Sequence, residues 1–337
     1  MRYPLALLAC LACLAPLHAA ASLDGADFGT YVHGPKLSAD DLKGRVVLFE
    51  FWGVNCPPCL RSIPHLAAWQ KAYGRDSFVI VANHAQNESN DKAKQVWLAQ
   101  GGADQISVVN GGGLSGAQVG HLPRCFLFDI QGKLIYEGSP FEVEGPLKKA
   151  VESSPGHLVA GYEWKKLRKE AFAVGKRQGI ATALKSARRI SEGKDPEAAA
   201  EAAELLSRVE AWSAKRSAEA SAARGDDPAE AYRIAIEMAA SLKGDPQAEP
   251  FDSLAKELKD DKACQNAIKG AELLARVKAQ AESYGLPQDP AGWLARASNK
   301  GKAQEIAQGL KSVASKHAGS KAASEAEELA KSWKLSG

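Results

Sequence analysis

The 337-residue sequence has little cysteine, little net charge and no long hydrophobic run. A formal net charge of +3, without basic runs interleaved with aromatic residues, argues against nucleic acid as a partner. No apolar stretch is long enough to cross a bilayer as a permanent helix. Of the six cysteines, Cys10 and Cys13 fall in the N-terminal apolar segment, and the remaining four are too few for a disulfide scaffold in a chain of this length. The length predicts two globular domains. The low net charge leaves proteins or small molecules as the expected partners.

The N-terminus has the pattern of a secretory signal peptide. A charged start precedes an apolar run over residues 5–17, and Ala19-Ala20-Ala21 supplies the small residues that a signal peptidase requires. We therefore expect residues 1–21 to be a signal peptide and the mature protein to be periplasmic or otherwise extracytoplasmic. Lipoprotein processing at Cys10 is the alternative, because the three residues before it loosely fit a lipobox.

The first half of the remaining chain alternates between short β-rich runs and amphipathic stretches. Over residues 22–154 the pattern predicts strands at 45–52, 78–82, 106–109, 125–129 and 133–137, and helices at 62–73, 91–100 and 147–151. Glycine-rich residues 111–116 are predicted to be a flexible loop. This order of elements predicts an α/β domain with a mixed central sheet flanked by helices.

The second half, residues 155–337, is rich in Ala, Lys and Glu and has helical spacing throughout. Asp-Pro pairs fit helix N-caps followed by a first-turn proline, and they occur at 195–196, 227–228, 245–246 and 289–290. Residues 203–209 recur in similar form at 271–277, although Ala/Glu/Leu helices resemble one another by composition alone. We expect an all-α domain, either a helical bundle or a tetratricopeptide-like helical-repeat module.

The strongest local signal is Cys56-Pro57-Pro58-Cys59, where a buried strand ends and a helix begins. Amide groups and the helix dipole favour a thiolate at the N-cap, and the thiolate is the nucleophile of disulfide exchange. We predict that Cys56 is the nucleophile and Cys59 the resolving thiol. The two prolines remove two amide donors, which predicts a less acidic Cys56 and a more reducing pair.

Two other interpretations of the cysteine pair are a structural disulfide and half of a zinc site. A zinc site needs four ligands, and the sequence has no second C-x-x-C and no close histidine pair to complete them. We therefore expect redox exchange, with no metal and no cofactor.

The stretch around the dithiol resembles the thioredoxin superfamily, and within it the exported TlpA/ResA type of thiol-disulfide oxidoreductase. The matching features are Phe51-Trp52-Gly53 before the dithiol, Pro64 beyond it, Leu122-Pro123 at the position of the family's cis-proline, and the final hairpin from Phe126 to Lys133. The resemblance covers residues 37–151 and implies a thioredoxin-like fold.

The resemblance also implies roles for individual residues. Glu50 falls where many thioredoxins bury an acid beneath the second cysteine, and it would accept the proton of Cys59; the alternative is a solvent-facing strand end. Pro123 would be cis and lie against the dithiol. The residues implied to contact substrate are Trp52, Pro57, Pro58, Leu122 and Arg124.

The sequence departs from the family pattern beside the dithiol. Asn55 replaces the usual aromatic residue, which predicts a more polar groove wall. Arg124 either supports the Cys56 thiolate, meets an acidic substrate or faces solvent. Cys125 is expected to be a buried strand residue, with a third-thiol role as the alternative. His121 could tune the dithiol, and Cys264 is expected to be inert core.

Together these features predict an extracytoplasmic thiol-disulfide oxidoreductase that reduces protein disulfides and receives electrons from a donor in the membrane. One alternative is a binding or assembly protein whose helical half recruits a protein partner. A peroxiredoxin-like peroxidase is the other alternative, but it would need threonine where Gly53 stands.

Overall fold

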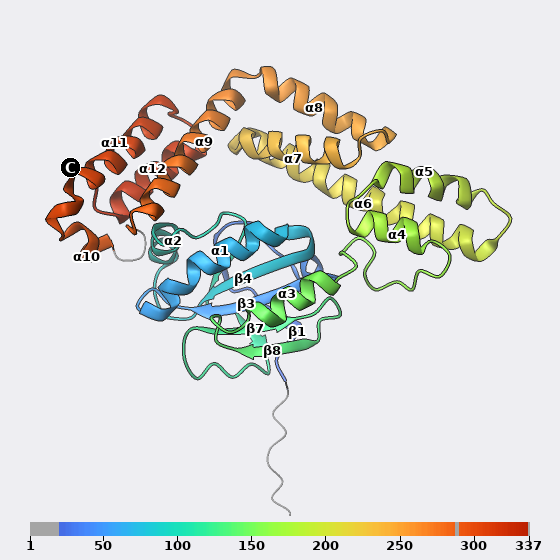
Figure 1. Ribbon diagram of the computed structural model, residues 1–337, viewed down its shortest axis with the longest axis horizontal. Helices are drawn as coiled ribbons and strands as arrows, with labels where there is room; N and C mark the ends of the chain where they lie inside the picture. The colour runs from blue at the N-terminus through green and yellow to red at the C-terminus, as the bar shows by residue number, and fades with distance from the viewer. Residues whose placement is uncertain (1–19, 287–289, 336–337) are drawn as a thin grey trace, which may run out of the picture.

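The computed structural model describes residues 20–286 and 290–335 (Figure 1). Apart from Ala20 and Ala21, the predicted signal peptide lies outside the described residues, and so does Cys10. Ala21 is buried against the central sheet immediately before the first strand.

A six-stranded mixed sheet forms the centre of the first half, with strand order β2-β5-β4-β3-β7-β8. Strand β3 pairs in parallel with β4 and antiparallel with β7, so the prediction of a mixed sheet is confirmed. The strands are β2 (Thr30–His33), β3 (Val46–Trp52), β4 (Phe78–His84), β5 (Ser107–Asn110), β7 (Arg124–Phe128) and β8 (Leu134–Gly138).

The two faces of the sheet are covered differently. Side chains of one face pack with α1 (Pro57–Ser77), α2 (Asn90–Ala99) and α3 (Glu144–Ser153). The other face packs against a two-stranded sheet of β1 (Ser22–Asp27) and β6 (Gly113–Ser115), and against the short 3-10 helix η1 (Ala39–Leu42). Alternate residues of β3 and β4 serve the two faces, which is why every residue of these strands is buried.

The prediction of a flexible loop over residues 111–116 is wrong. Residues 113–115 form β6, which pairs antiparallel with β1. Backbones approach closely here, because a Cβ on Gly112 would lie 2.4 Å from the carbonyl oxygen of Asp27. The glycines therefore permit close approach of two chain segments rather than flexibility.

Helices make up most of residues 168–286 and 290–332, as predicted for the second half. The α-helices are α4 (Arg168–Gly175), α5 (Ile180–Ser191), α6 (Pro196–Asp226), α7 (Pro228–Ser241), α8 (Glu249–Asp260), α9 (Lys262–Ser283), α10 (Pro290–Leu294), α11 (Lys300–Lys316) and α12 (Lys321–Ser332), with 3-10 helices η2 (Pro246–Ala248) and η3 (Ala297–Asn299). Each helix from α4 to α8 packs on the next, α11 and α12 pack on α9 and on each other, and together α4–α12 form a helical arch over α1 (Figure 1).

The predicted Asp-Pro caps can be checked at three of the four pairs. The carboxylates of Asp195, Asp227 and Asp245 each accept a backbone N–H at the start of the following helix, so these N-caps are confirmed. Asp289 lies outside the described residues. The interpretation as helical repeats remains a prediction.

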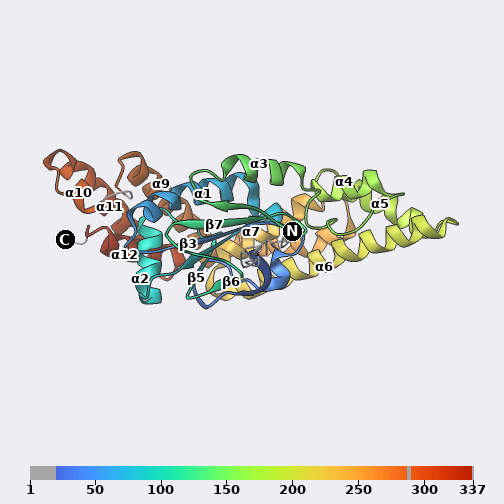
Figure 2. The same cartoon turned by 90° about the horizontal axis from the view of Figure 1, so that it is seen from below.

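The helical arch contacts the first half near its beginning and at its end, and Figure 2 shows α12 beside α2 at one side of the molecule and α4 beyond α3 at the other. At one end the Arg177 guanidinium lies 2.6 Å from the Asp76 carboxylate, and Lys215 pairs with Asp41. At the other end α12 packs on α2, and the indole of Trp333 donates to the backbone oxygen of Ala99 at 2.8 Å.

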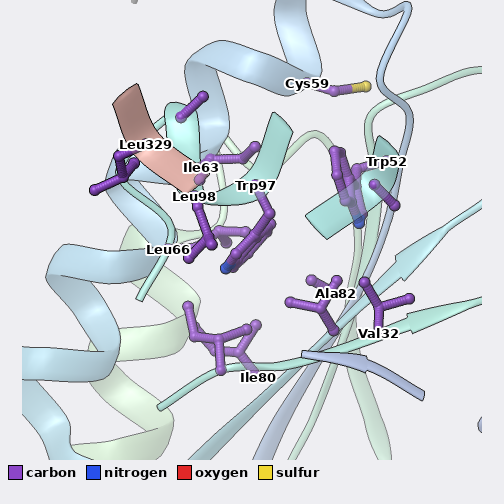
Figure 3. Close-up of a cluster of buried hydrophobic side chains, with 14 of the residues drawn as sticks. Val32, Trp52, Cys59, Ile63, Leu66, Ile80, Ala82, Trp97, Leu98 and Leu329 are labelled. Atoms are coloured by element: carbon purple, nitrogen blue, oxygen red, sulfur yellow. The ribbon is translucent and has the colours of Figure 1, made fainter. Parts of the chain in front are cut away.

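One hydrophobic core cluster joins α12 to the core beneath the dithiol. Figure 3 shows Leu329 of α12 together with Leu98 and Trp97 of α2 and Ile63 of α1. The division into domains at residues 154 and 155 remains a prediction, and this cluster runs across it. Among the described residues, no helix has the length and apolar character needed to span a bilayer.

We expect Trp333→Phe to lower the free energy of unfolding by about 1–3 kcal/mol, because the buried oxygen of Ala99 loses its donor. Urea denaturation measures this loss. Trp69→Phe on the half-buried face of α1 is the control. Equal effects of the two substitutions would contradict a specific role for the indole donor.

Candidate active site

The dithiol lies where β3 leads into α1. Cys56 is the N-cap of α1 and forms a disulfide with Cys59, whose Cα is 5.2 Å away. Pro57 and Pro58 carry no N–H, so the first-turn amide that reaches the Cys56 sulfur is that of Cys59, at 3.3 Å. Cys59 is fully buried and Cys56 is 7% exposed, so the first cysteine is the more accessible one.

Glu50 lies in the middle of β3 and has no exposed surface. The alternative of a solvent-facing strand end is therefore wrong. Burial raises the pKa of Glu50 to about 8, although the hydrogen bond from Ser62 opposes the shift. The other carboxyl oxygen, Oε2, is buried without a hydrogen-bond partner. Glu50 is therefore mostly protonated at neutral pH and can exchange a proton near that pH.

Ser62 links Glu50 to the first turn of α1. Its hydroxyl oxygen lies 2.7 Å from Glu50 Oε1 and 2.8 Å from the backbone oxygen of Cys59. A hydroxyl has one proton and can fully satisfy only one of these acceptors. When Glu50 is protonated, its own O–H donates to Ser62 and the hydroxyl donates to Cys59, so both contacts are satisfied.

The Leu122–Pro123 peptide bond is cis, as the resemblance implied. Arg124 pairs with Phe51 across β7 and β3, so Leu122 and Pro123 lie beside the end of β3 that leads to the dithiol. Pro123 is buried and Leu122 is half-buried.

The residues expected to contact substrate differ in exposure. Pro57 is exposed, and Pro58, Leu122 and Arg124 are half-buried, so a bound chain could reach them. Trp52 has no exposed surface, because its ring packs against His84 and Trp97 with ring centroids 5.2 and 5.5 Å away. The burial of Trp52 does not fit a substrate contact, and its indole instead forms part of the core beneath the dithiol.

The structure also gives the surroundings of Arg124, Cys125 and His121, which lie in or next to β7. The guanidinium of Arg124 lies 2.6 Å from the carboxylate of Glu137 on β8, so it is engaged by that strand. Cys125 is buried opposite Glu50 in the β3–β7 register, and burial raises the pKa of its thiol. A neutral buried thiol fits the expected core role. His121 is exposed, and its effect on the dithiol remains a prediction.

Cys264 lies far along the chain, in the first turn of α9. It is buried, and its thiol donates to the backbone oxygen of Pro228 at 3.3 Å, as expected of inert core. Across residues 20–286 and 290–335, no cluster of three or more His, Cys, Asp or Glu side chains is arranged to hold a metal ion.

The loop over residues 85–89, between β4 and α2, contacts the approach to the dithiol and was not predicted. The backbone N–H of Asn55 donates to Gln86 Oε1 at 2.8 Å, and Asn55 Nδ2 donates to Glu88 Oε1 at 3.2 Å. Gln86 crosses Gly53 so closely that a Cβ there would lie 2.2 Å from Gln86 Cδ. The glycine at 53 was the one sequence signal of this close packing.

A helix-capping cysteine with a small exposed surface, a fully buried second cysteine and a buried carboxyl group define the dithiol site of a thioredoxin-like thiol-disulfide oxidoreductase. Comparison with known proteins agrees: the Redoxin family model matches residues 22–152. The thiol-disulfide oxidoreductase ResA of Bacillus thuringiensis (strain Al Hakam) is 32% identical over 126 residues, which cover 36% of this chain and 72% of ResA. The chain belongs to this family of thiol-disulfide oxidoreductases.

Two further similarities are more limited. The thioredoxin-like protein YneN of Bacillus subtilis (strain 168) is 36% identical over 59 residues, covering 18% of this chain and 35% of YneN. A thioredoxin-family thiol:disulfide interchange protein from Chlorobium tepidum TLS covers 37% of this chain and 93% of its own, with a TM-score of 0.31 and 22% identity. The family match ends at residue 152, so the helical arch lies beyond it.

Proposed function

We propose that this oxidoreductase acts outside the cytoplasm as a reductase of disulfides in other proteins. The observation that carries the proposal is the dithiol at the start of α1, with Cys56 more exposed than Cys59 and the buried Glu50 linked through Ser62 to the first turn of the helix. The signal-peptide pattern of residues 1–21 supports an extracytoplasmic location.

In the first step, the Cys56 thiolate attacks one sulfur of a substrate disulfide. The disulfide bond of the substrate breaks, a mixed disulfide forms, and the second substrate sulfur leaves as a thiolate that takes up a proton. The Cys59 N–H that reaches the Cys56 sulfur supports the thiolate.

In the second step, Cys59 transfers its proton to Glu50 and its thiolate attacks the Cys56 sulfur. The mixed disulfide breaks, the substrate sulfur that was bonded to Cys56 leaves as a thiolate and takes up a proton from solvent, and two electrons have moved from the protein to the substrate. A carboxyl group with a pKa of about 8 is suited to this transfer, because its ionised fraction at neutral pH is small but available.

A reductase must be reduced again after each cycle, so we propose a membrane-bound donor of electrons as a partner. We also propose that residues 155–337 form a separate helical domain that recruits a protein partner. Phe172 on α4 and Ile236 on α7 expose 61% and 44% of their surfaces and offer apolar contacts on the helical arch.

The reduction potential of the Cys56–Cys59 pair tests the direction of electron flow. Because Pro57 and Pro58 supply no amide donors to the Cys56 thiolate, we expect a value near that of thioredoxin, about −270 mV. Equilibration of the protein lacking residues 1–21 with glutathione or dithiothreitol buffers measures it. A value near that of DsbA, about −120 mV, would make the protein an oxidant or isomerase and contradict the proposal.

A further inference from the structure

Two side chains of the loop over residues 85–89 hold the segment that precedes the nucleophilic cysteine. Gln86 accepts the backbone N–H of Asn55 at 2.8 Å, and Glu88 accepts the side-chain amide of Asn55 at 3.2 Å. Asn55 is thus bound at both its backbone and its side chain, one residue before Cys56. We call Gln86, Glu88 and Asn55 the loop clamp.

The loop clamp is itself anchored to the sheet. The N–H of Ala85 donates to the backbone oxygen of Trp52 at 2.8 Å, so the loop continues the contact of β3 with β4. At its other end, Asn110 Nδ2 donates to the backbone oxygen of Glu88 at 2.9 Å. The position of Asn110 is fixed in turn, because its Oδ1 lies 3.0 Å from Nδ1 of the buried His84.

Gln86 can occupy its position because residue 53 is glycine and has no side chain. A Cβ on Gly53 would come within 2.2 Å of Gln86 Cδ and 2.5 Å of its Oε1. Gln86 therefore lies flat across Gly53, half-buried, with its oxygen directed at the Asn55 amide. A side chain packed on one surface and hydrogen-bonded at its tip has little freedom left to lose when the dithiol reacts.

We propose that Gln86, assisted by Glu88, is a positioning residue that holds Cys56 in the geometry of the Cys56–Cys59 disulfide and so makes the dithiol more reducing. The hydrogen bonds are present with the disulfide formed, and breaking it lets Cys56 and the preceding Asn55 relax away from Gln86. A contact that is stronger in the oxidised protein stabilises the disulfide relative to the two thiols. The inference deepens the proposed reductase function and rests on it.

This arrangement explains the presence of asparagine at position 55. An aromatic ring at this position has no amide group to donate to Glu88, so the departure from the family pattern and the contact with Glu88 belong together. The same arrangement accounts for a glutamine in an otherwise exposed loop, since its oxygen serves the backbone of another segment.

The equilibrium with glutathione tests the proposal. Two glutathione thiols reduce the Cys56–Cys59 disulfide to the dithiol and become one glutathione disulfide. We expect Gln86→Ala to raise this equilibrium constant about three- to tenfold, the effect of losing one hydrogen bond. This change corresponds to a potential about 15 to 30 mV less negative.

Matched variants separate the hydrogen bond from packing. Gln86→Met retains the contact with Gly53 but has no acceptor, so it should shift the equilibrium as Gln86→Ala does. Gln86→Glu retains an acceptor oxygen and should stay near wild type, as should Asn87→Ala, which alters an exposed neighbour in the same loop. Glu88→Ala should shift the equilibrium in the same direction by a smaller factor, because its contact is longer and exposed.

Melting curves of all variants show whether each is folded. An unchanged equilibrium constant in Gln86→Met, with or without a lower melting temperature, would overturn the proposal and leave Gln86 a merely structural residue. The result is a ratio to wild type, so it is independent of the absolute potential. A wild-type potential near that of DsbA would contradict the reductase function without deciding the role of Gln86.

Discussion

Cys59→Ser is expected to trap the protein on its substrates as a stable mixed disulfide, whereas Cys56→Ser abolishes reaction with disulfides. The first variant retains the accessible nucleophile and lacks the buried thiol that releases the substrate. The second retains only Cys59, which has no exposed surface from which to attack a protein disulfide. Neither variant should turn over insulin faster than a protein lacking both cysteines.

Non-reducing electrophoresis after incubation of each reduced variant with insulin measures the trapped species. Cys125→Ala and Cys264→Ala serve as controls, because both thiols are buried and neither is assigned a role in exchange. Capture by Cys56→Ser in place of Cys59→Ser would reverse the assignment of nucleophile and resolving thiol.

The buried carboxyl group of Glu50 should make the protein less stable as the pH rises. The unfolded chain releases this proton near the ordinary value of 4.5, but the folded protein keeps it until about pH 8. Between these values the folded state binds more protons, so the free energy of unfolding falls by about 1.4 kcal/mol per pH unit. The stabilisation that comes from the protonated Glu50 is fully present below about pH 4.5. About 4 kcal/mol of it is lost when the pH reaches about 8.

Glu50→Gln should remove this slope and be the more stable protein in alkaline solution. Urea denaturation of the oxidised proteins at about pH 5 and about pH 9 makes the comparison. Glu142→Gln, a substitution of an exposed carboxylate, should retain the wild-type slope. Parallel slopes for wild type and Glu50→Gln would mean that Glu50 is already ionised in the folded protein.

Sequence patterns alone predict the structure correctly where the local signal and the burial of the segment agree. Strands β3 and β4 are mostly apolar and buried along their whole length because both faces of the sheet are covered, and the C-x-x-C motif falls where a buried strand gives way to a helix. Burial of Glu50 followed from the resemblance rather than from periodicity. In each case the information lies within a few residues of the position concerned.

The missed features depend on partners that are distant in the sequence. Strand β1 has the polar, glycine-containing sequence Ser22–Asp27, and it becomes a strand only by pairing with residues 113–115. Trp52 reads as part of an active-site motif, but its burial depends on α2. Gln86 gives no local signal at all, since its role is set by Gly53 and Asn55 on another segment.

Leu329 and Trp333 lie four residues apart, a helical spacing that indicates a buried face without saying what covers it. The answer is α2, whose last turn supplies the Ala99 oxygen to the Trp333 indole. Amphipathic periodicity identifies the side of a helix that is hidden, and it carries no information about the surface opposite.

Attachment of the helical arch at both ends fixes its length. A row of stacked helices with a free end can gain or lose a pair during evolution, because each helix needs only its neighbours. Here the row is held to the body just after its first helix, where Arg177 meets Asp76, and just after its last, where Trp333 meets Ala99. The first half of the chain therefore sets the distance that the helical arch has to span. A change in the number of helices between the two contacts would have to be matched by a change in the distance between them.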